Sequence, residues 1–279
     1  MSLLREARKI LSTYRIRPKK RFGQNFLVDD KILDRIIQYA SVNKSDRVLE
    51  IGAGLGFLTE RLAKKADQVI AVEIDSRLTK ILTKRLRKYE NVIILEGDIL
   101  KIKPPEFNKV VSVPPYSISS PLLFWLLKKD FEIAVLTFQE EFSRRLVAPA
   151  GTKDYGRLTV SVYCRAEAEL LEAVPKEAFW PMPKVNSMIV RLKPRGMPFY
   201  VEDEEEFSNF VRDVFTQRNK KLRNAVYTYL NRLGISKKEA VEIANSIPFF
   251  QRRTRELMPE ELGLAFNELF RKLQNFKTT

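Results

Sequence analysis

Two acidic side chains and a glycine-rich turn follow apolar runs, and together they are the residues best suited to hold a small ligand. The turn, Gly52–Gly56, separates a β-branched run from a helical pattern, and glycines there let the backbone turn tightly beside a ligand. Glu73 ends the next apolar run, where a carboxylate can accept hydrogen bonds from two ribose hydroxyls. Asp98 ends the third run, and its carboxylate can accept a hydrogen bond from an adenine amine.

The spacing of the glycines distinguishes between kinds of nucleotide. A dinucleotide-binding turn has the pattern Gly-x-Gly-x-x-Gly, whereas here the third glycine, Gly56, comes one residue early. This departure argues against NAD and favours a nucleoside without phosphates. The carboxylates at the strand ends therefore predict a pocket for S-adenosylmethionine, whose sulfonium and ammonium charges suit an acidic cleft.

A stiff loop follows the fourth apolar run. Its sequence, Val113-Pro114-Pro115-Tyr116, is one residue away from Asn/Asp-Pro-Pro-Tyr, a common pattern in enzymes that methylate an exocyclic amine. Each proline fixes φ and removes an N–H donor, so the loop holds its acceptors in place. Tyr116 offers a face on which an extruded base can stack, worth about 1–3 kcal/mol. Phe179 can close the other face, unless it only packs between strands.

Val113 stands where that pattern has a polar residue, and valine accepts no hydrogen bond. Losing one aligned acceptor in a dry site costs about 2–4 kcal/mol, which is about 30- to 1000-fold in rate. The carbonyl of Pro114 would remain as an acceptor. Three interpretations stay open: a weakened enzyme, a natural variant that compensates through Ser112 or Ser117, or a residue changed on purpose.

The periodicity of the chain indicates the elements that must position these residues. Five β-branched runs alternate with stretches of helical spacing, which predicts a mostly parallel sheet with helices on both faces. The runs are RVLEIGAG, QVIAVEID, NVIILEGD, NKVVSVPPY and EIAVLTFQ, and the helical stretches are LGFLTERLAKKA, SRLTKILTKRLRKY and SPLLFWLLKK. Later, RLTVSVYCRAEAELLEAV and NSMIVRLKP predict further strands that form an antiparallel pair at the sheet edge.

A linker, KPRGMPFYVEDEEE, separates this pattern from a helical one. Three helical stretches follow it, with Gly234 capping the first and Ser236 starting the second. We therefore expect a Rossmann-like α/β domain over residues 1–200 and a small all-α domain over residues 201–279.

Composition excludes several classes of protein. The 279 residues include no histidine and one cysteine, Cys164, so a Cys/His metal site, a histidine-based triad and an intrachain disulfide are excluded. We expect no metal. No secretory signal or run of about 18 apolar residues is present, so we expect a soluble, cytoplasmic protein. The formal net charge of +15 favours a polyanionic partner, above all nucleic acid.

The positive charge gathers in clusters that suit the phosphates of folded RNA. Isolated charges are better explained as a solvated surface. The N-terminal arm carries Arg5, Arg8, Lys9, Arg15, Arg17, Lys19, Lys20 and Arg21; the helical region carries Arg212, Arg218, Lys220, Lys221 and Arg223, then Arg252, Arg253 and Arg255.

Over nearly its full length the chain resembles the rRNA adenine N6,N6-dimethyltransferases of the KsgA/Dim type. The matching stretches are RPKKRFGQNFL, LEIGAGLGFLT, VEID, GDIL, KDYGRLTVSV, AFWPMPKVNSMIVRLKP and FTQRNKKLRNA, while FQEEFSRRLVA looks closest to archaeal members. No single motif is specific, but their joint order and spacing are. The resemblance implies a class I methyltransferase domain and a helical rRNA-binding domain.

The resemblance also implies an activity and a set of residues. Enzymes of this family use S-adenosylmethionine to dimethylate two adjacent adenosines near the 3′ end of small-subunit rRNA, a step of ribosome biogenesis. The implied cofactor contacts are Gln24, Asn25, Leu27, Gly52, Gly54, Glu73, Ile74, Asp98, Ile99 and Val113; the implied catalytic contacts are Val113, Pro114, Tyr116 and Phe179. From the density of positive charge, we expect RNA contacts at Arg17, Lys19, Lys20, Arg21, Arg218, Lys220, Lys221 and Arg223.

Two other functions share parts of this pattern. Val113 leaves open a catalytically impaired or inactive ribosome-assembly or transcription factor that keeps the fold and binds RNA. A DNA adenine methyltransferase would share the loop chemistry, although the N-terminal arm and the helical region favour rRNA. We expect the protein to act as a monomer on rRNA within an immature ribosomal particle.

Overall fold

The computed structural model describes residues 2–19 and 22–277, which form two compact units. Unit 1 comprises Met1–Ser143 and Glu167–Pro194, and unit 2 comprises Arg144–Ala166 and Arg195–Thr279. This differs from a single division at residue 200. The segment Arg144–Ala166 belongs with the helical unit because its apolar side chains, including Tyr155, pack into that unit's core.

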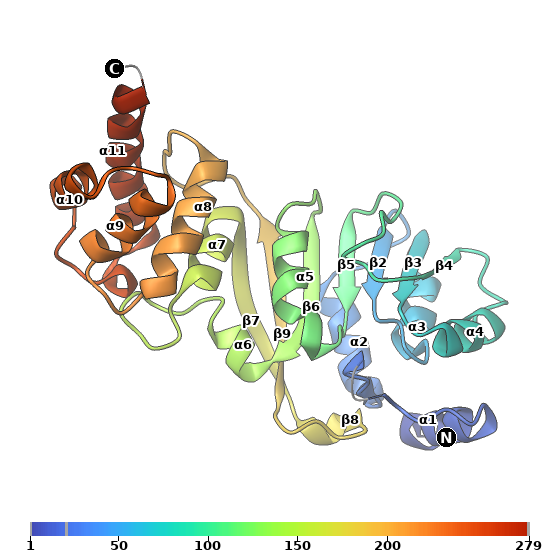
Figure 1. Cartoon of the computed structure of the whole chain (residues 1–279). Helices are drawn as coiled ribbons and strands as arrows, with labels where there is room; N and C mark the ends of the chain where they lie inside the picture. Colours follow the sequence, from blue (N-terminus) through green and yellow to red (C-terminus); the bar gives the residue numbers. More distant parts are fainter. Residues whose placement is uncertain (1, 20–21, 278–279) are drawn as a thin grey trace. The chain divides into compact units, whose positions relative to one another are not determined.

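A seven-stranded sheet forms the centre of unit 1, in the order β4-β3-β2-β5-β6-β9-β7 (Figure 1). Its strands are β2 Arg47–Ile51, β3 Gln68–Glu73, β4 Val92–Glu96, β5 Lys109–Ser112, β6 Ile133–Gln139, β7 Ala166–Val174 and β9 Ser187–Pro194. The first five are paired in parallel, and β9 is antiparallel to β6. The central strands are buried almost throughout, as expected for parallel strands covered on both faces.

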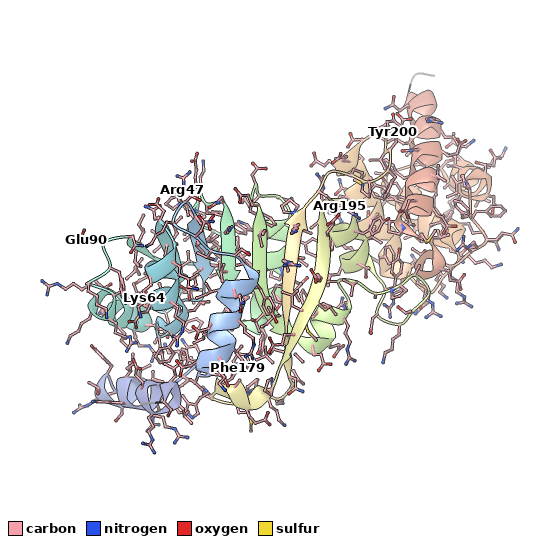
Figure 2. All side chains as sticks on the ribbon, turned by 180° about the vertical axis from the view of Figure 1, so that it is seen from behind. Arg47, Lys64, Glu90, Phe179, Arg195 and Tyr200 are labelled. Carbon is pink, nitrogen blue, oxygen red and sulfur yellow. The ribbon has the colours of Figure 1, made fainter. Side chains whose placement is uncertain are left out.

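Helices cover both faces of this sheet. They are α2 Asp30–Tyr39, α3 Phe57–Lys65, α4 Ser76–Arg85, α5 Ser119–Leu126 and the short α6 Glu140–Arg144. Helices α2 and α3 pack together on one face, and α5 lies on the other (Figures 1 and 2). The Rossmann-like sheet with an antiparallel edge is therefore confirmed, as are the five predicted strands.

An N-terminal segment extends this unit. Helix α1, Leu3–Thr13, buries one apolar side in the core of unit 1. The chain then continues to the short strand β1, Phe26–Leu27, which pairs antiparallel with β8, Phe179–Trp180. This pairing fixes Phe179 opposite Leu27.

One strand prediction is wrong in its first half. RLTVSVYC is not a strand, because Arg157–Arg165 forms helix α7; the strand β7 begins only at Ala166. The β-branched residues favour a strand locally, but Val160 and Cys164, four residues apart, lie on one side of α7 and pack into the core of unit 2. Tertiary packing outweighs local preference here.

Unit 2 is helical. It contains α7, α8 Glu204–Val214, α9 Leu222–Arg232, α10 Lys237–Ser246 and α11 Pro259–Lys277. As predicted, Gly234 follows α9 with a φ of +82°, and the Ser236 side chain caps α10 by accepting a hydrogen bond from the backbone N–H of Glu239. The basic stretch between α8 and α9 interrupts the helical pattern instead of continuing it. None of the helices described is both long and apolar enough to cross a membrane.

Candidate active site

The strand order places a crevice at the carboxyl end of the sheet. From β2 the chain proceeds through β3 to β4 at one edge, then returns to β5 on the other side of β2. Ligands bind in open α/β sheets at such a reversal of strand order. Figure 2 shows Phe179 at the end of unit 1 opposite to Arg47, the first residue of β2, and therefore near the end where the parallel strands finish.

One pocket at this end brings together almost all of the predicted cofactor and catalytic residues. Its lining includes Gln24, Asn25, Gly52, Gly54, Glu73, Ile74, Asp98, Ile99, Val113, Pro114, Tyr116 and Phe179. Leu27 is the exception, because its buried side chain lines a smaller adjoining cavity. Asn25 and Val113 line both cavities.

The glycine turn is shaped by the segments packed against it. Gly52 has a φ of +77°, and a Cβ atom there would lie 2.9 Å from Cδ of Pro115. A Cβ on Gly54, with a φ of +58°, would lie 3.1 Å from the Phe26 ring. Both positive φ values favour glycine. At Gly52 the proline loop also leaves no room for a Cβ atom, and at Gly54 the Phe26 ring would have to shift slightly.

Glu73 is buried at the end of β3 and held by backbone N–H groups. Its Oε2 accepts from Gly54 N at 2.9 Å, and its Oε1 accepts from Asp75 N at 2.9 Å. Burial raises the pKa of Glu73, and these two hydrogen bonds oppose that shift. Each carboxylate oxygen keeps a lone pair for a further donor, so Glu73 can still accept hydrogen bonds from two hydroxyl groups.

The other walls of the pocket fit a nucleoside. Asp98 is half-buried, and its Oδ1 accepts from Leu100 N at 3.1 Å. Ile74, which is 45% exposed, and the buried Ile99 supply apolar surface on the pocket wall. A flat aromatic base with a polar edge suits this combination.

The proline loop is held at its tyrosine. The Tyr116 hydroxyl shares a 2.5 Å hydrogen bond with Ser187 Oγ at the start of β9. The Phe179 ring lies edge-on to Tyr116, with 6.4 Å between ring centroids. Burial raises the pKa of Tyr116, so this residue stays a neutral phenol at neutral pH. Phe179 both packs in the core of unit 1 and lines the pocket, so the two predicted roles are compatible.

The two serines that could compensate for Val113 differ in whether their hydroxyl groups are available. Ser112 is fully buried; its Oγ donates to Ile51 O at 2.6 Å and accepts from Ile51 N at 3.3 Å. It is therefore committed to strand β2. Ser117 is exposed and lines the pocket, so its hydroxyl remains accessible.

Sequence reasoning assigned no role to Glu50, although it precedes the glycine turn. This residue is 2% exposed, lines the smaller cavity, and leaves Oε2 without a partner in the described part of the chain. Burial, with a contribution from the charge of Glu73, raises the pKa of Glu50 to about 8. An acidic residue within an apolar run was the available sign.

The basic residues fall into separate groups. In the arm, Arg17 is exposed and Lys19 is half-buried, with its ammonium 5.4 Å from the Phe22 ring centroid. Lys20 and Arg21 lie outside the described residues.

In unit 2, Lys220, Lys221 and Arg223 are exposed, at the end of the interruption between α8 and α9 and in the first turn of α9. Arg218 is half-buried and donates to the carbonyl of Tyr155 at 3.1 Å. Part of its role is therefore to hold the segment before α7 in place.

Known proteins similar to this chain are RNA-methylating enzymes. A family model described as ribosomal RNA adenine dimethylase matches residues 15–253. A relative from Methanosarcina acetivorans, named as a probable ribosomal RNA small subunit methyltransferase A, is 48% identical and covers 94% of this chain and 97% of its own. A relative of the same name from Thermococcus kodakarensis is 43% identical and covers 94% of each chain.

Solved structures extend the similarity to the fold. A dimethyladenosine transferase from Plasmodium falciparum matches with a TM-score of 0.70 and 31% identity, over 90% of this chain and 96% of that one. The 23S rRNA methyltransferase ErmE matches with a TM-score of 0.64 and 31% identity, over 88% of this chain and 100% of that one.

These similarities bear on the two other functions that share parts of the sequence pattern. The matching family and the relatives above carry the names of RNA-methylating enzymes, so an inactive binding protein and a DNA methyltransferase find no support. The chain belongs to the ribosomal RNA adenine dimethylase family.

Proposed function

We propose that this chain uses S-adenosylmethionine to dimethylate N6 of two adjacent adenosines near the 3′ end of small-subunit rRNA. The observation that carries the proposal is one pocket lined by both Glu73 and Asp98 and by the Val113–Tyr116 loop. Family membership supports the reaction, and the names of the archaeal relatives support the small subunit as the target.

The pocket residues fit the cofactor. Glu73 would hold the ribose hydroxyls, Asp98 would accept from the adenine amine, and Ile74 and Ile99 would flank the ring. When bound, S-adenosylmethionine supplies an electrophilic methyl group. The glycine turn leaves its backbone bare beside the place where the remainder of the cofactor would lie.

The target adenine would be held by the proline loop. Tyr116 supplies a stacking face, fixed in orientation by Ser187, and Phe179 supports it from the side. Adenine N6 is a poor nucleophile because its lone pair is delocalised into the ring. The Pro114 carbonyl and the Ser117 hydroxyl can accept hydrogen bonds from the amine and favour a tetrahedral nitrogen.

The RNA itself would be bound by positive charge. Arg17 and Lys19 on the arm, and Lys220, Lys221 and Arg223 in unit 2, would contact phosphates. Lys20 and Arg21 belong to the same proposal. The protein would act as a monomer in the cytoplasm, on rRNA within an immature ribosomal particle, and its binding would weaken steeply with salt.

The test is methyl transfer from labelled S-adenosylmethionine to immature small-subunit particles, with nucleoside analysis of the product. We expect N6,N6-dimethyladenosine at two adjacent positions near the 3′ end. Large-subunit particles are the contrast, because ErmE, a structural relative, is named for 23S rRNA. Label in the large subunit alone, or label in neither, would overturn the proposal.

A further inference from the structure

Gln24 is engaged at both ends of its side-chain amide. Its Oε1 accepts from the backbone N–H of Lys19 at 2.7 Å, and its Nε2 donates to Oδ2 of Asp75 at 2.9 Å. The orientation of the amide is fixed by chemistry, because a backbone N–H only donates and a carboxylate only accepts. One side chain thus joins the basic arm to the turn after β3.

Asp75 is buried and held by other groups besides Gln24. Its side chain is 3% exposed, and Arg77 binds it through Nε at 2.9 Å and through Nη2 at 2.5 Å. The Arg77 guanidinium and the Gln24 amide hold the pKa of Asp75 well below its usual range, so it is charged in any ordinary buffer. A charged acceptor makes the hydrogen bond from Gln24 stronger than one between neutral groups.

Asp75 also contacts a residue that lines the proposed cofactor pocket. The backbone N–H of Asp75 donates to Oε1 of Glu73, the carboxylate placed to hold the ribose. On the other side of Gln24 lies the arm that carries Arg17 and Lys19. Gly23 precedes Gln24 in the chain. A Cβ atom on Gly23 would lie 3.3 Å from Cβ of Pro115 and 3.4 Å from Oγ of Ser117, so the N-terminal segment also packs closely against the proline loop.

We infer that Gln24 is a positioning residue that couples cofactor binding to RNA binding, through the connection Lys19–Gln24–Asp75–Glu73. A ligand on Glu73 stabilises the turn that carries Asp75, and the two hydrogen bonds of Gln24 extend that stabilisation to the arm that contacts RNA. Each ligand therefore binds an arrangement that the other has already ordered. This inference rests on the proposed function and adds to it a role distinct from direct contact with the cofactor.

This coupling can be measured as a factor, the ratio of the dissociation constants for one ligand in the absence and in the presence of the other. Allosteric coupling in proteins is typically about 5- to 150-fold, and we expect about 5- to 20-fold tighter RNA binding when S-adenosylhomocysteine, the unreactive product, is present. By thermodynamic linkage, RNA must tighten S-adenosylhomocysteine binding by the same factor.

The experiment measures both dissociation constants, each with and without the other ligand, on immature small-subunit particles. Gln24→Met keeps the length of the side chain and removes both hydrogen bonds. Gln24→Glu keeps the shape and the acceptor for Lys19 N–H but opposes the charge of Asp75. We expect a coupling factor near one in both variants. Gln24 also lines the pocket, so the two separate affinities are measured alongside, and the test is the factor itself and not either affinity. Gln38→Met, on the exposed side of α2, is the matched control and keeps the wild-type factor.

Retained coupling in both Gln24 variants would overturn the inference, as would a wild-type factor of one. Loss of S-adenosylhomocysteine binding without RNA would also overturn it, because Gln24 would then be a direct cofactor contact. Thermal unfolding of each variant identifies a folding defect, and the isosteric Gln24→Glu tests the inference if Gln24→Met unfolds. Failure of the proposed function looks different, since the wild-type protein would then leave small-subunit particles unlabelled in the methyl-transfer assay, whatever its coupling factor.

Discussion

The two ends of the pocket achieve order by different means. At the proposed cofactor end, Glu73 and Asp98 accept hydrogen bonds from backbone N–H groups, and these acids would provide the recognition. At the target end, the loop offers a valine, two prolines and an aromatic ring, and only Tyr116 is tied by a side-chain hydrogen bond. Charge is fixed in advance at one end, and shape at the other.

This difference indicates where substitutions are tolerated. At the proposed cofactor end, recognition of the ribose would depend on one carboxylate, whereas a stacking loop distributes its contacts over several groups. We therefore expect the cofactor end to respond more strongly than the target end to single substitutions.

The largest expected effect is at Glu73. Glu73→Ala removes the acceptor of two ribose hydroxyls, and hydrogen bonds to charged groups contribute about 1.5–3 kcal/mol each. Cofactor affinity should fall by at least about 100-fold. Titration with S-adenosylhomocysteine measures this, with thermal unfolding as the check that the turn still folds. A loss below tenfold would show that the two ends do not differ in this way.

Val113→Asn should produce the next largest effect, as a gain. An added acceptor aimed at the amine should raise the rate of methyl transfer by about 30- to 1000-fold. The first transfer should gain more than the second, because a monomethylated amine has only one N–H left to donate. Single-turnover assays that separate the monomethyl and dimethyl products measure both steps. Equal rates in the two proteins would show that Pro114 and Ser117 suffice, and that Val113 is no defect.

Glu50, beside the glycine turn, makes the stability of the fold depend on pH. Its pKa rises from a usual value near 4.5 in the unfolded chain to about 8 in the folded one. The folded state thus binds a proton more tightly, so stability is lost as the pH rises from about 4.5 towards 8 and is constant above that range. Glu50→Gln removes this penalty.

We therefore expect Glu50→Gln to be more stable than the wild type by about 4 kcal/mol at pH 8, with little difference at pH 4.5. Urea unfolding at several pH values gives this comparison, with Glu60→Gln as a control for a carboxylate that is paired near the surface. A difference that does not change with pH would mean that Glu50 is charged in the folded protein.

The sequence alone predicted most of the pocket, for physical reasons. Gly52, Glu73 and Asp98 sit at strand ends marked by strong periodicity, and parallel strands bring their carboxyl ends to one edge. The helix at Arg157–Arg165 was missed because its β-branched residues favour a strand, and only packing within unit 2 decides otherwise. The bonds of Gln24 and Ser112 join residues far apart in the chain, and no local pattern reports such contacts.

The smallest effect expected is at Tyr116, where the target end relies on shape. Tyr116→Ala removes the stacking face, which is worth about 1–3 kcal/mol per base, and Phe179 remains to contact part of the adenine. We expect kcat/KM to fall by about 5- to 30-fold.

Tyr116→Phe is the matched control, because it keeps the ring and loses only the bond to Ser187. It should cost about 1 kcal/mol, or about fivefold. Steady-state kinetics measure the loss in kcat/KM for both variants. Titration with S-adenosylhomocysteine should show that neither substitution changes cofactor affinity. If Tyr116→Ala reduced cofactor affinity as strongly as Glu73→Ala, the two ends of the pocket would be a single cooperative site, and the contrast between fixed charge and fixed shape would fail.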